Sequence, residues 1–345
     1  MMARLGYQRK RLRDLATALS AGRQLAERER WPRERLERHQ RERLEALVRH
    51  ARERSAFWAG RLPRGRVSLE QLPIMEKVEL MASLDELLTD HRLRSDELFA
   101  HLEGIDRDEL YPSMAALLAN EQLAGRLRLQ LGGMSTSSEP LMPEVRERLE
   151  RAFGVRPFNL YGTTEGLWGS DCEERTGIHL FEDMCIVENV DAEGRAVPVG
   201  EPGARVLVTN LFNRIQPLIR FEVSDIVTVE PEPYACGRTL MRLRDVEGRS
   251  EDVIEIGGVA VHPMQFAPLS ADRAVREFQV VQEGERLRLR VALRAGANGA
   301  PQRLQATLAE RLRETGVAQP VIEIDVVESL ERSAAGKLRL IVADA

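Results

Sequence analysis

The sequence predicts a mixed α/β (α+β) fold with a barrel-like antiparallel β subdomain and a small α+β unit at its C-terminal end. Two observations lead to this prediction. Between residues 178 and 230, short apolar runs alternate with turns rich in Gly and Pro, which is typical of an antiparallel sheet. After residue 258, a short helix, a hairpin, a second helix and a strand follow in order, which is typical of a small α+β domain.

Length and composition indicate a soluble protein of more than one domain. The chain has 345 residues, of which 43% are hydrophobic and 30% are charged. No apolar run approaches the length needed to cross a bilayer, and the N-terminus lacks the core of a signal peptide. Three cysteines in so long a chain argue against a disulfide framework. We therefore expect a cytoplasmic protein without a membrane partner.

The charge is distributed unevenly along the chain. Residues 1–66 carry 19 Lys/Arg and 8 Asp/Glu, a net charge of +11, which leaves −16 on the remainder of a chain whose net charge is −5. The arginines of this basic segment alternate with glutamates at helical spacing, which favours a solvated helix face over a nucleic-acid partner. Only three of the basic residues are lysines, namely Lys10, Lys77 and Lys337. Because the chain uses arginine at almost every basic position, each lysine is a candidate for a role that requires a compact cation.

The first half of the chain reads mainly as helices. Two helices are expected at 4–28 and 32–56, divided at Trp31-Pro32, because proline suits a first helical turn. The alternation of Leu127-Arg-Leu-Gln-Leu131 predicts a short strand. Shorter helical pieces are expected at 77–100, and longer helices at 113–124 and 140–153.

The second half reads mainly as strands. A polar boundary is expected at 245–258, ending in the paired glycines Gly257 and Gly258. Expected strands are 178–181, 185–190, 205–211, 217–221 and 226–230; beyond the boundary come a short helix at 263–269, a hairpin of 278–283 and 286–293, a helix at 301–314 and a strand at 321–327.

One stretch, Tyr161-Gly162-Thr163-Thr164-Glu165-Gly166, combines the groups that a nucleotide site needs. Tyr161 offers a flat face for a base, and the two threonines offer hydroxyls for phosphate oxygens. Glu165 offers the hard oxygen ligand that Mg²⁺ prefers. The same pattern also fits a polar turn, and Asp225, a candidate for binding paired sugar hydroxyls, also fits a turn residue.

With these pieces in order, the chain resembles the phenylacetate–CoA ligase branch of the adenylate-forming acyl-CoA synthetases, over roughly residues 30–345. Tyr161–Glu165 is similar to that family's adenine and metal motif, and Ser137-Ser138-Glu139-Pro140 to the segment lining the adenine pocket. Asp225 falls where the family binds the ribose. Gly248-Arg249-Ser-Glu251-Asp resembles the hinge motif, and Ser333-Ala-Ala-Gly-Lys337 the loop that carries the catalytic lysine.

The resemblance implies a fold, an activity and a set of roles. The implied fold is a shortened adenylate-forming domain at 61–250, after a basic helical arm at 1–60 and before a mobile C-terminal domain at 251–345. The implied reaction joins a carboxylic acid to ATP with Mg²⁺, and then to coenzyme A. Catalytic roles fall to Lys337, Thr164 and Glu165, the last also the Mg²⁺ ligand. Binding roles fall to Ser138, Glu139, Tyr161, Gly162, Thr163, Asp225 and Arg249, and the hinge role to Glu251.

The sequence departs from the family in one important segment. The Ser/Thr/Gly-rich loop that wraps the outer phosphates has no counterpart between Asp90 and Tyr111. Two alternatives to CoA ligation therefore stay open: an impaired member acting as a nucleotide- or adenylate-binding module, and transfer to a carrier-protein thiol. An uncovered core at this point would favour a homodimer. The identity of the acid stays open, with Phe158, Trp168 and Gly169 hinting at an aromatic or mid-sized acyl group.

A zinc site is a further alternative. Some relatives hold a structural zinc through a Cys/His pair and a Cys-x-Cys motif. Here Cys172, His179 and Cys236 are present, but Tyr234 stands where the fourth ligand is expected. Three ligands leave a closed structural site incomplete, so reduced cysteines with a satisfied histidine are the competing interpretation.

Overall fold

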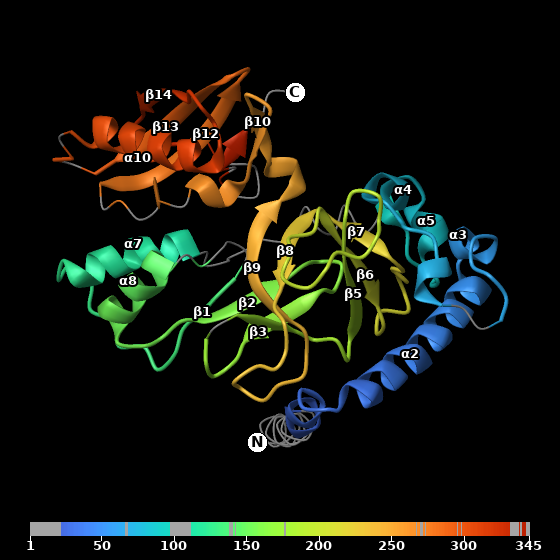
Figure 1. Ribbon diagram of the computed structural model, residues 1–345. Helices are drawn as coiled ribbons and strands as arrows, with labels where there is room; N and C mark the ends of the chain where they lie inside the picture. Colours follow the sequence, from blue (N-terminus) through green and yellow to red (C-terminus); the bar gives the residue numbers. More distant parts are fainter. Residues whose placement is uncertain are drawn as a thin grey trace.

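The structure is a computed structural model. In Figure 1 the chain runs from an N-terminal helix, through a curled sheet, to a C-terminal unit beside that sheet. Its described residues are 22–65, 68–96, 112–137, 141, 143–175, 177–266, 268–269, 272, 274–294, 296–297, 299–331, 338 and 340–342. None of the helices within these ranges combines the length and the apolar character that a membrane crossing requires.

A six-stranded sheet forms the centre of the main unit, in the order β1-β2-β3-β4-β9-β8. Strands β1 and β2 run parallel, whereas the other neighbours are antiparallel. The sheet is curled into a half-barrel, which agrees with the predicted barrel-like subdomain (Figure 1). The strands are β1 Ser135–Thr136, β2 Phe158–Gly162, β3 Trp168–Asp171, β4 Ile178–Leu180, β8 Asp225–Val229 and β9 Arg242–Arg249.

A second, three-stranded antiparallel sheet, β5-β6-β7, shares its core with the first. Its strands are β5 Cys185–Val190, β6 Arg205–Asn210 and β7 Phe221–Val223. Val206 and Val208 of β6 are fully buried in this core, together with Val227 of β8. Both faces of these two strands are covered, since β6 is buried from Val206 to Asn210 and β8 is buried along its whole length.

Helix α2, Arg33–Arg54, covers this core from the N-terminal side. Leu44, Leu47 and Ala51 recur at helical spacing and are almost completely buried, whereas the arginines between them face solvent. Pro32 immediately precedes the helix, which confirms the predicted break at Trp31-Pro32. Short helical segments follow at α3 Ala56–Ala59, η1 Leu69–Gln71, α4 Lys77–Ala82 and α5 Leu84–Leu87.

Two further helices, α7 (Pro112–Leu123) and α8 (Pro143–Phe153), pack against each other beside β1. Ala115, Ala119 and Leu149 form the centre of their contact, and the small alanine side chains let the helices approach closely. Gly125 follows α7 with φ of 74°, the left-handed conformation expected of a glycine after a helix. Helix α8 starts at Pro143, three residues later than the sequence predicted.

The C-terminal unit has its own core and the α+β pattern predicted for it. Its sheet has the order β14-β13-β12-β15, with α10 packed on one face through Leu304, Leu308 and Leu312. The elements are η2 Ser250–Asp252, β10 Ile254–Ile256, β11 Val259–Val261, η3 Pro263–Phe266, β12 Val275–Glu283, β13 Arg286–Leu293, α10 Ala300–Thr315, β14 Val321–Val326 and β15 Ile341–Val342.

The strand predicted at 127–131 does not form. Within the described part of the chain, these residues belong to no strand and pair with none. The side chain of Gln122 takes the place of a neighbouring strand: its amide donates to the Leu129 carbonyl at 3.0 Å and accepts from the Leu129 N–H at 2.9 Å. The alternation of apolar residues therefore did not by itself produce a paired strand.

Two other strand boundaries were wrong. The strand predicted at 217–221 begins only at Phe221, because Arg220 has φ of 45°, a left-handed conformation that cannot continue a ladder. The Arg220 guanidinium is buried against Glu188 and the Leu72 carbonyl, which holds it there. The polar boundary predicted to start at 245 is instead the end of β9, since pairing with the apolar β8 outweighs local polarity.

Candidate functional site

The candidate site lies where the curled sheet brings β2 and β8 together. The Tyr161 hydroxyl at the end of β2 donates a hydrogen bond to Oδ2 of Asp225, at the start of β8, over 2.5 Å. These strands are separated by β3, β4 and β9 in the sheet order, so only the curl allows this contact. Two residues that the sequence singled out independently are therefore neighbours.

Electrostatics keep this pair in one protonation state. Burial, followed by the Asp225 carboxylate, raises the pKa of Tyr161 well above its usual value. The phenol therefore stays protonated and donates to a carboxylate, which is a charge-assisted hydrogen bond. Arg249, which pairs with Asp225 in the β8–β9 register, places Nε 3.6 Å from Oδ1 of Asp225 while much of its side chain stays exposed. A basic group thus stands at the mouth of the site.

The Thr163–Gly166 segment is a tight turn between β2 and β3, as its polar sequence suggested. The Thr163 N–H donates to the Leu167 carbonyl at 2.9 Å, and the Gly166 N–H to the Thr163 carbonyl at 3.1 Å. Thr164 is exposed at the tip and Glu165 is half-buried. This turn places Thr163, Thr164 and Glu165 at the end of β2, close after Tyr161 in the chain.

Asn210 holds this turn in place, and sequence reasoning missed it. Its Nδ2 donates to the Glu165 carbonyl at 2.9 Å, and its Oδ1 accepts from the N–H groups of Phe212 and Asn213. A Cβ on Gly166, whose φ is 95°, would lie 2.1 Å from that same Nδ2. No local pattern reveals this role, because Asn210 is 44 residues away from Gly166 and was predicted only as part of the strand 205–211.

Three predicted residues, Ser138, Glu139 and Lys337, lie outside the described residues. Glu251, the predicted hinge residue, falls in the short helix η2, whose Ser250 N–H donates to the Ser224 carbonyl at 2.7 Å. The structure therefore brings together the residues from β2, β8 and β9.

A second cluster joins the three residues considered as zinc ligands. The ligand atoms of Cys172, His179 and Cys236 all lie within 4.8 Å of one another. Nε2 of His179 is 3.3 Å from the Cys236 sulfur, and Nδ1 is 2.9 Å from the Leu240 carbonyl. Because a carbonyl can only accept, Nδ1 carries the proton and Nε2 presents its lone pair to the cysteines, the arrangement that metal-binding histidines show.

Tyr234 does not supply a fourth ligand. Its hydroxyl donates to the Glu230 carbonyl at 3.0 Å and accepts from the Arg242 N–H at 3.1 Å, while its ring packs edge-on against His179 at 5.1 Å. The tyrosine therefore supports the histidine from the side. Among the described residues, the donor set is two sulfurs and one nitrogen.

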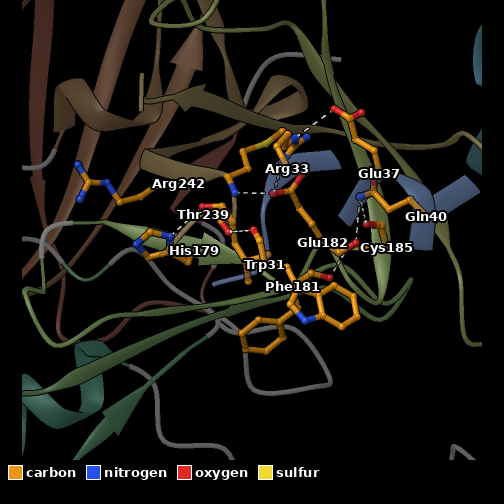
Figure 2. Close-up of polar contacts among 12 residues, drawn as sticks. Trp31, Arg33, Glu37, Gln40, His179, Phe181, Glu182, Cys185, Thr239 and Arg242 are labelled. Carbon is orange, nitrogen blue, oxygen red and sulfur yellow. Dashed lines mark hydrogen bonds and ion pairs between the residues drawn. The ribbon is translucent and has the colours of Figure 1, made fainter. Parts of the chain in front are cut away.

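A buried acid, Glu182, ties the N-terminal helix to this part of the sheet (Figure 2). Its carboxylate accepts from Arg33 at 2.9 Å and from the Met241 N–H at 2.5 Å, and its carbonyl accepts from Gln40 at 2.9 Å. Burial raises the pKa of Glu182, although Arg33 opposes the shift. No sequence pattern indicates this role, since Glu182 lies in an ordinary turn between two strands.

Sequence comparison finds relatives of one kind. No family model matches the chain. A phenylacetate-coenzyme A ligase of Thermus thermophilus is 32% identical over 184 residues, covering 50% of this chain and 41% of the relative. One of Escherichia coli K12 is 31% identical over 158 residues, covering 42% and 35%. The chain thus matches less than half of the length of these curated relatives.

Structure comparison agrees on the fold. A 2-hydroxyisobutyryl-CoA ligase, solved in the postadenylation state with an acyl-AMP, has a TM-score of 0.71 at 20% identity, covering 92% of this chain and 91% of that one. The same ligase in an open conformation with CoA has a TM-score of 0.56 at 19% identity, covering 88% and 91%. Over half of its length the chain is thus similar in sequence to phenylacetate-coenzyme A ligases, and it has the fold of the 2-hydroxyisobutyryl-CoA ligase.

Proposed function

We propose that this chain is an AMP-forming acyl- or aryl-CoA ligase. A carboxylate would attack the α-phosphate of ATP to give an acyl-adenylate and pyrophosphate, and the thiol of coenzyme A would then displace AMP to give the thioester. The observation that carries the proposal is the contact between Tyr161 and Asp225, with Arg249 beside it, next to the Thr163–Gly166 turn. The names of the sequence relatives point to the same reaction.

In this proposal each residue of the cluster binds one part of the nucleotide. Each oxygen of the Asp225 carboxylate has two lone pairs, so it can accept from ribose hydroxyls while it still accepts from Tyr161. The Tyr161 ring would face the adenine, and Arg249 would approach the phosphates as a fixed positive charge. Gly162, Thr163, Ser138 and Glu139 would complete the binding segment.

The residues at the turn fit a magnesium ion. Mg²⁺ takes oxygen ligands from one or two carboxylates together with substrate phosphates and water. Glu165 offers such a carboxylate, half-buried beside Thr164. When bound, the ion would neutralise charge on the phosphates, and Thr164 would donate its hydroxyl to a phosphate oxygen. Lys337 would stabilise the charge that develops at the α-phosphate.

The chain would work as a main domain at 61–250 and a mobile domain at 251–345, with Glu251 at the pivot. Gly248 supports this placement of the joint. A Cβ at Gly248, whose φ is 119°, would lie 2.7 Å from the Pro263 ring, so the end of β9 contacts the C-terminal unit directly. Rotation of the second domain would admit coenzyme A after the first step.

The second candidate function is an impaired member that binds nucleotide or adenylate without completing the reaction. It is favoured by the absence of a Ser/Thr/Gly-rich run between Asp90 and Tyr111. Transfer to a carrier-protein thiol is a variant of the first candidate with a different acceptor. Incubation with ATP, Mg²⁺, a panel of aryl and alkyl acids, and either coenzyme A or a phosphopantetheinylated carrier protein separates these possibilities.

Mass spectrometry of the products distinguishes the three candidate functions. A CoA thioester supports the ligase, and a loaded carrier protein supports the variant. AMP binding without any adenylate or thioester supports the binding module and contradicts the ligase. Asp225→Ala is the control with a weakened site, because it removes the proposed ribose contact.

We also propose that Cys172, His179 and Cys236 hold a zinc ion. Zn–S and Zn–N bonds are about 2.3 and 2.0 Å long, so donors within 4.8 Å of one another need only a small contraction around the ion. Tyr234 leaves the fourth position to water. The ion would join the turn after β3 to the segment before β9.

A further inference from the structure

The end of β2 opposite the candidate nucleotide site is hollowed. Strands β1 and β2 run parallel, and their first pair is Ser135 with Phe158. Tyr161 lies at the other end of β2. Two hollows open at the first end and share Gly133, Met134 and Ser135 as a common rim. A ligand there would not touch the Tyr161–Asp225 pair.

The larger of these two hollows is basic. It is an open pocket of about 640 Å³ beside the Gly132-Gly133 turn, with Arg156 and Arg175 in its wall. The Arg175 guanidinium stacks on the Phe158 ring at 4.2 Å. Within the described part of the chain, its Nη1 is buried without any hydrogen-bond acceptor. Arg175 as a whole is only partly buried and lines the hollow, so an anion in the hollow would lie beside its positive charge.

The backbone at Arg175 supports the same conclusion. Its φ is 55°, which is uncommon for a residue with a side chain, and its N–H donates to the Cys172 carbonyl at 3.1 Å. Such strain is maintained where the surrounding structure needs a side chain at one particular point. Arg156, at the rim, already pairs with Glu150 through Nε at 3.2 Å, so Arg175 is the principal anion-binding group.

The second hollow is apolar. It is a cavity of about 280 Å³ whose wall includes Leu118, Leu131 and Phe153. A dry cavity of about 150 Å³ is large enough to bind benzene, so this one can hold an aryl ring or an alkyl tail of moderate length. Leu118 is 38% exposed at its edge, which leaves the cavity open to a ligand.

We propose that these joined hollows bind an amphiphilic anion, with its head group on Arg175 and its apolar tail between α7 and α8. A carboxylate or a phosphate can both accept the two parallel N–H bonds that a guanidinium offers. The Gly132 and Gly133 backbone is open on its solvent side, where an added Cβ would meet nothing within 4 Å, so it leaves room for the head group.

Calorimetric titration of the full-length protein with four probes tests this proposal. Octanoate and octyl phosphate carry both parts, and they compare the two head groups; acetate lacks the tail, and 1-octanol lacks the charge. We expect saturable binding of at least one of the first two probes and no measurable binding of acetate. Octanol binding as tightly as both charged probes would overturn the proposal, as would the failure of both charged probes to bind.

Three variants locate the binding. Arg175→Gln should lower the affinity for the probe that binds by about tenfold or more, which is the size expected for losing a charge-assisted hydrogen bond. Leu118→Asp should weaken it similarly by placing a carboxylate beside the tail. Arg151→Gln, the matched control, changes the same charge on the exposed side of α8 and should leave affinity unchanged. Circular dichroism confirms folding, and unchanged binding by folded Arg175→Gln would contradict the site.

Discussion

The Tyr161 hydroxyl donates to the Asp225 carboxylate at 2.5 Å, across a sheet in which their strands are not neighbours. This contact closes the curled sheet at the end where the Thr163–Gly166 turn begins. It also fixes the carboxylate, so that its remaining lone pairs have a defined direction. A ribose that binds there meets an acceptor that is already oriented, which reduces the entropy lost on binding.

The first prediction concerns Asp225. Asp225→Ala should weaken AMP binding by about ten- to a hundredfold, because hydrogen bonds to a charged group contribute about 1.5–3 kcal/mol. The same variant should hardly change the affinity for 2′,3′-dideoxy-AMP, which has no hydroxyls for the carboxylate. Calorimetry with both nucleotides checks this. An equal loss for the two nucleotides would show that Asp225 acts on the fold and not on the ribose.

The second prediction concerns Gly166. Gly166→Ala would require φ of 95° from alanine and would place a methyl group against Asn210. Gly65 has almost the same φ, 98°, with open space around it, so Gly65→Ala measures the backbone cost alone. That cost is about 1–2 kcal/mol. Gly166→Ala should lower the free energy of unfolding by roughly a further 1–3 kcal/mol because of overpacking.

Urea denaturation of both glycine variants makes the comparison. Equal losses would mean that the Asn210 side chain moves away freely and does not hold the turn. In that case the double variant Gly166→Ala with Asn210→Ala should be no better than the single one. If Asn210 holds the turn, removal of its side chain should relieve the clash but lose the Glu165 hydrogen bond.

The third prediction concerns Glu182 and pH. Burial raises its pKa in the folded protein, so the folded state binds this proton more tightly than the unfolded state. Its favourable contribution is therefore complete below the unfolded pKa of about 4.3 and is lost as pH rises through the higher folded pKa. The free energy of unfolding of the wild type, relative to Glu182→Gln, should fall from pH 4 upward. A difference that rises with pH would contradict this.

The fourth prediction concerns the metal cluster. Purified protein should contain about one zinc per chain, and Cys236→Ser should lose it because two donors hold zinc poorly. Cys185 gives the matched control: it is a buried free cysteine outside the cluster, and burial raises its pKa to about 12. Cys185→Ser should keep the metal. Metal analysis of the wild type with a stoichiometry near zero would refute the zinc proposal.

The sequence predicted most elements whose pattern is local. The stripe on α2, the hairpin of β12 and β13, and helix α10 follow from the spacing of their own apolar residues. Residues 127–131 had the alternation of a strand, but whether a strand forms depends on a neighbour that no local pattern reveals. Arg220 likewise reads as part of a strand, and only its buried contact with Glu188 explains why it is not.

The candidate site likewise combines residues that could be predicted from the sequence with residues that could not. Tyr161, Asp225 and Arg249 were found from the sequence because they belong to recognisable motifs. Their contact could not be predicted, because it depends on the curl of the sheet. Asn210 and Glu182 have no motif, and their roles arise only from what tertiary packing places beside them. No sequence pattern pointed to Arg175 either, since its unpaired nitrogen is visible only in the structure.

The measurement that tests the central claim most directly is carboxylate-dependent exchange of labelled pyrophosphate into ATP. It reports the adenylation step alone, so it does not depend on the thiol acceptor. We expect exchange with at least one acid of a broad aryl and alkyl panel, and a loss of about a hundredfold or more in Lys337→Ala, as for removal of a group that stabilises transition-state charge. No exchange with any acid of the panel would contradict catalytic adenylation by this chain.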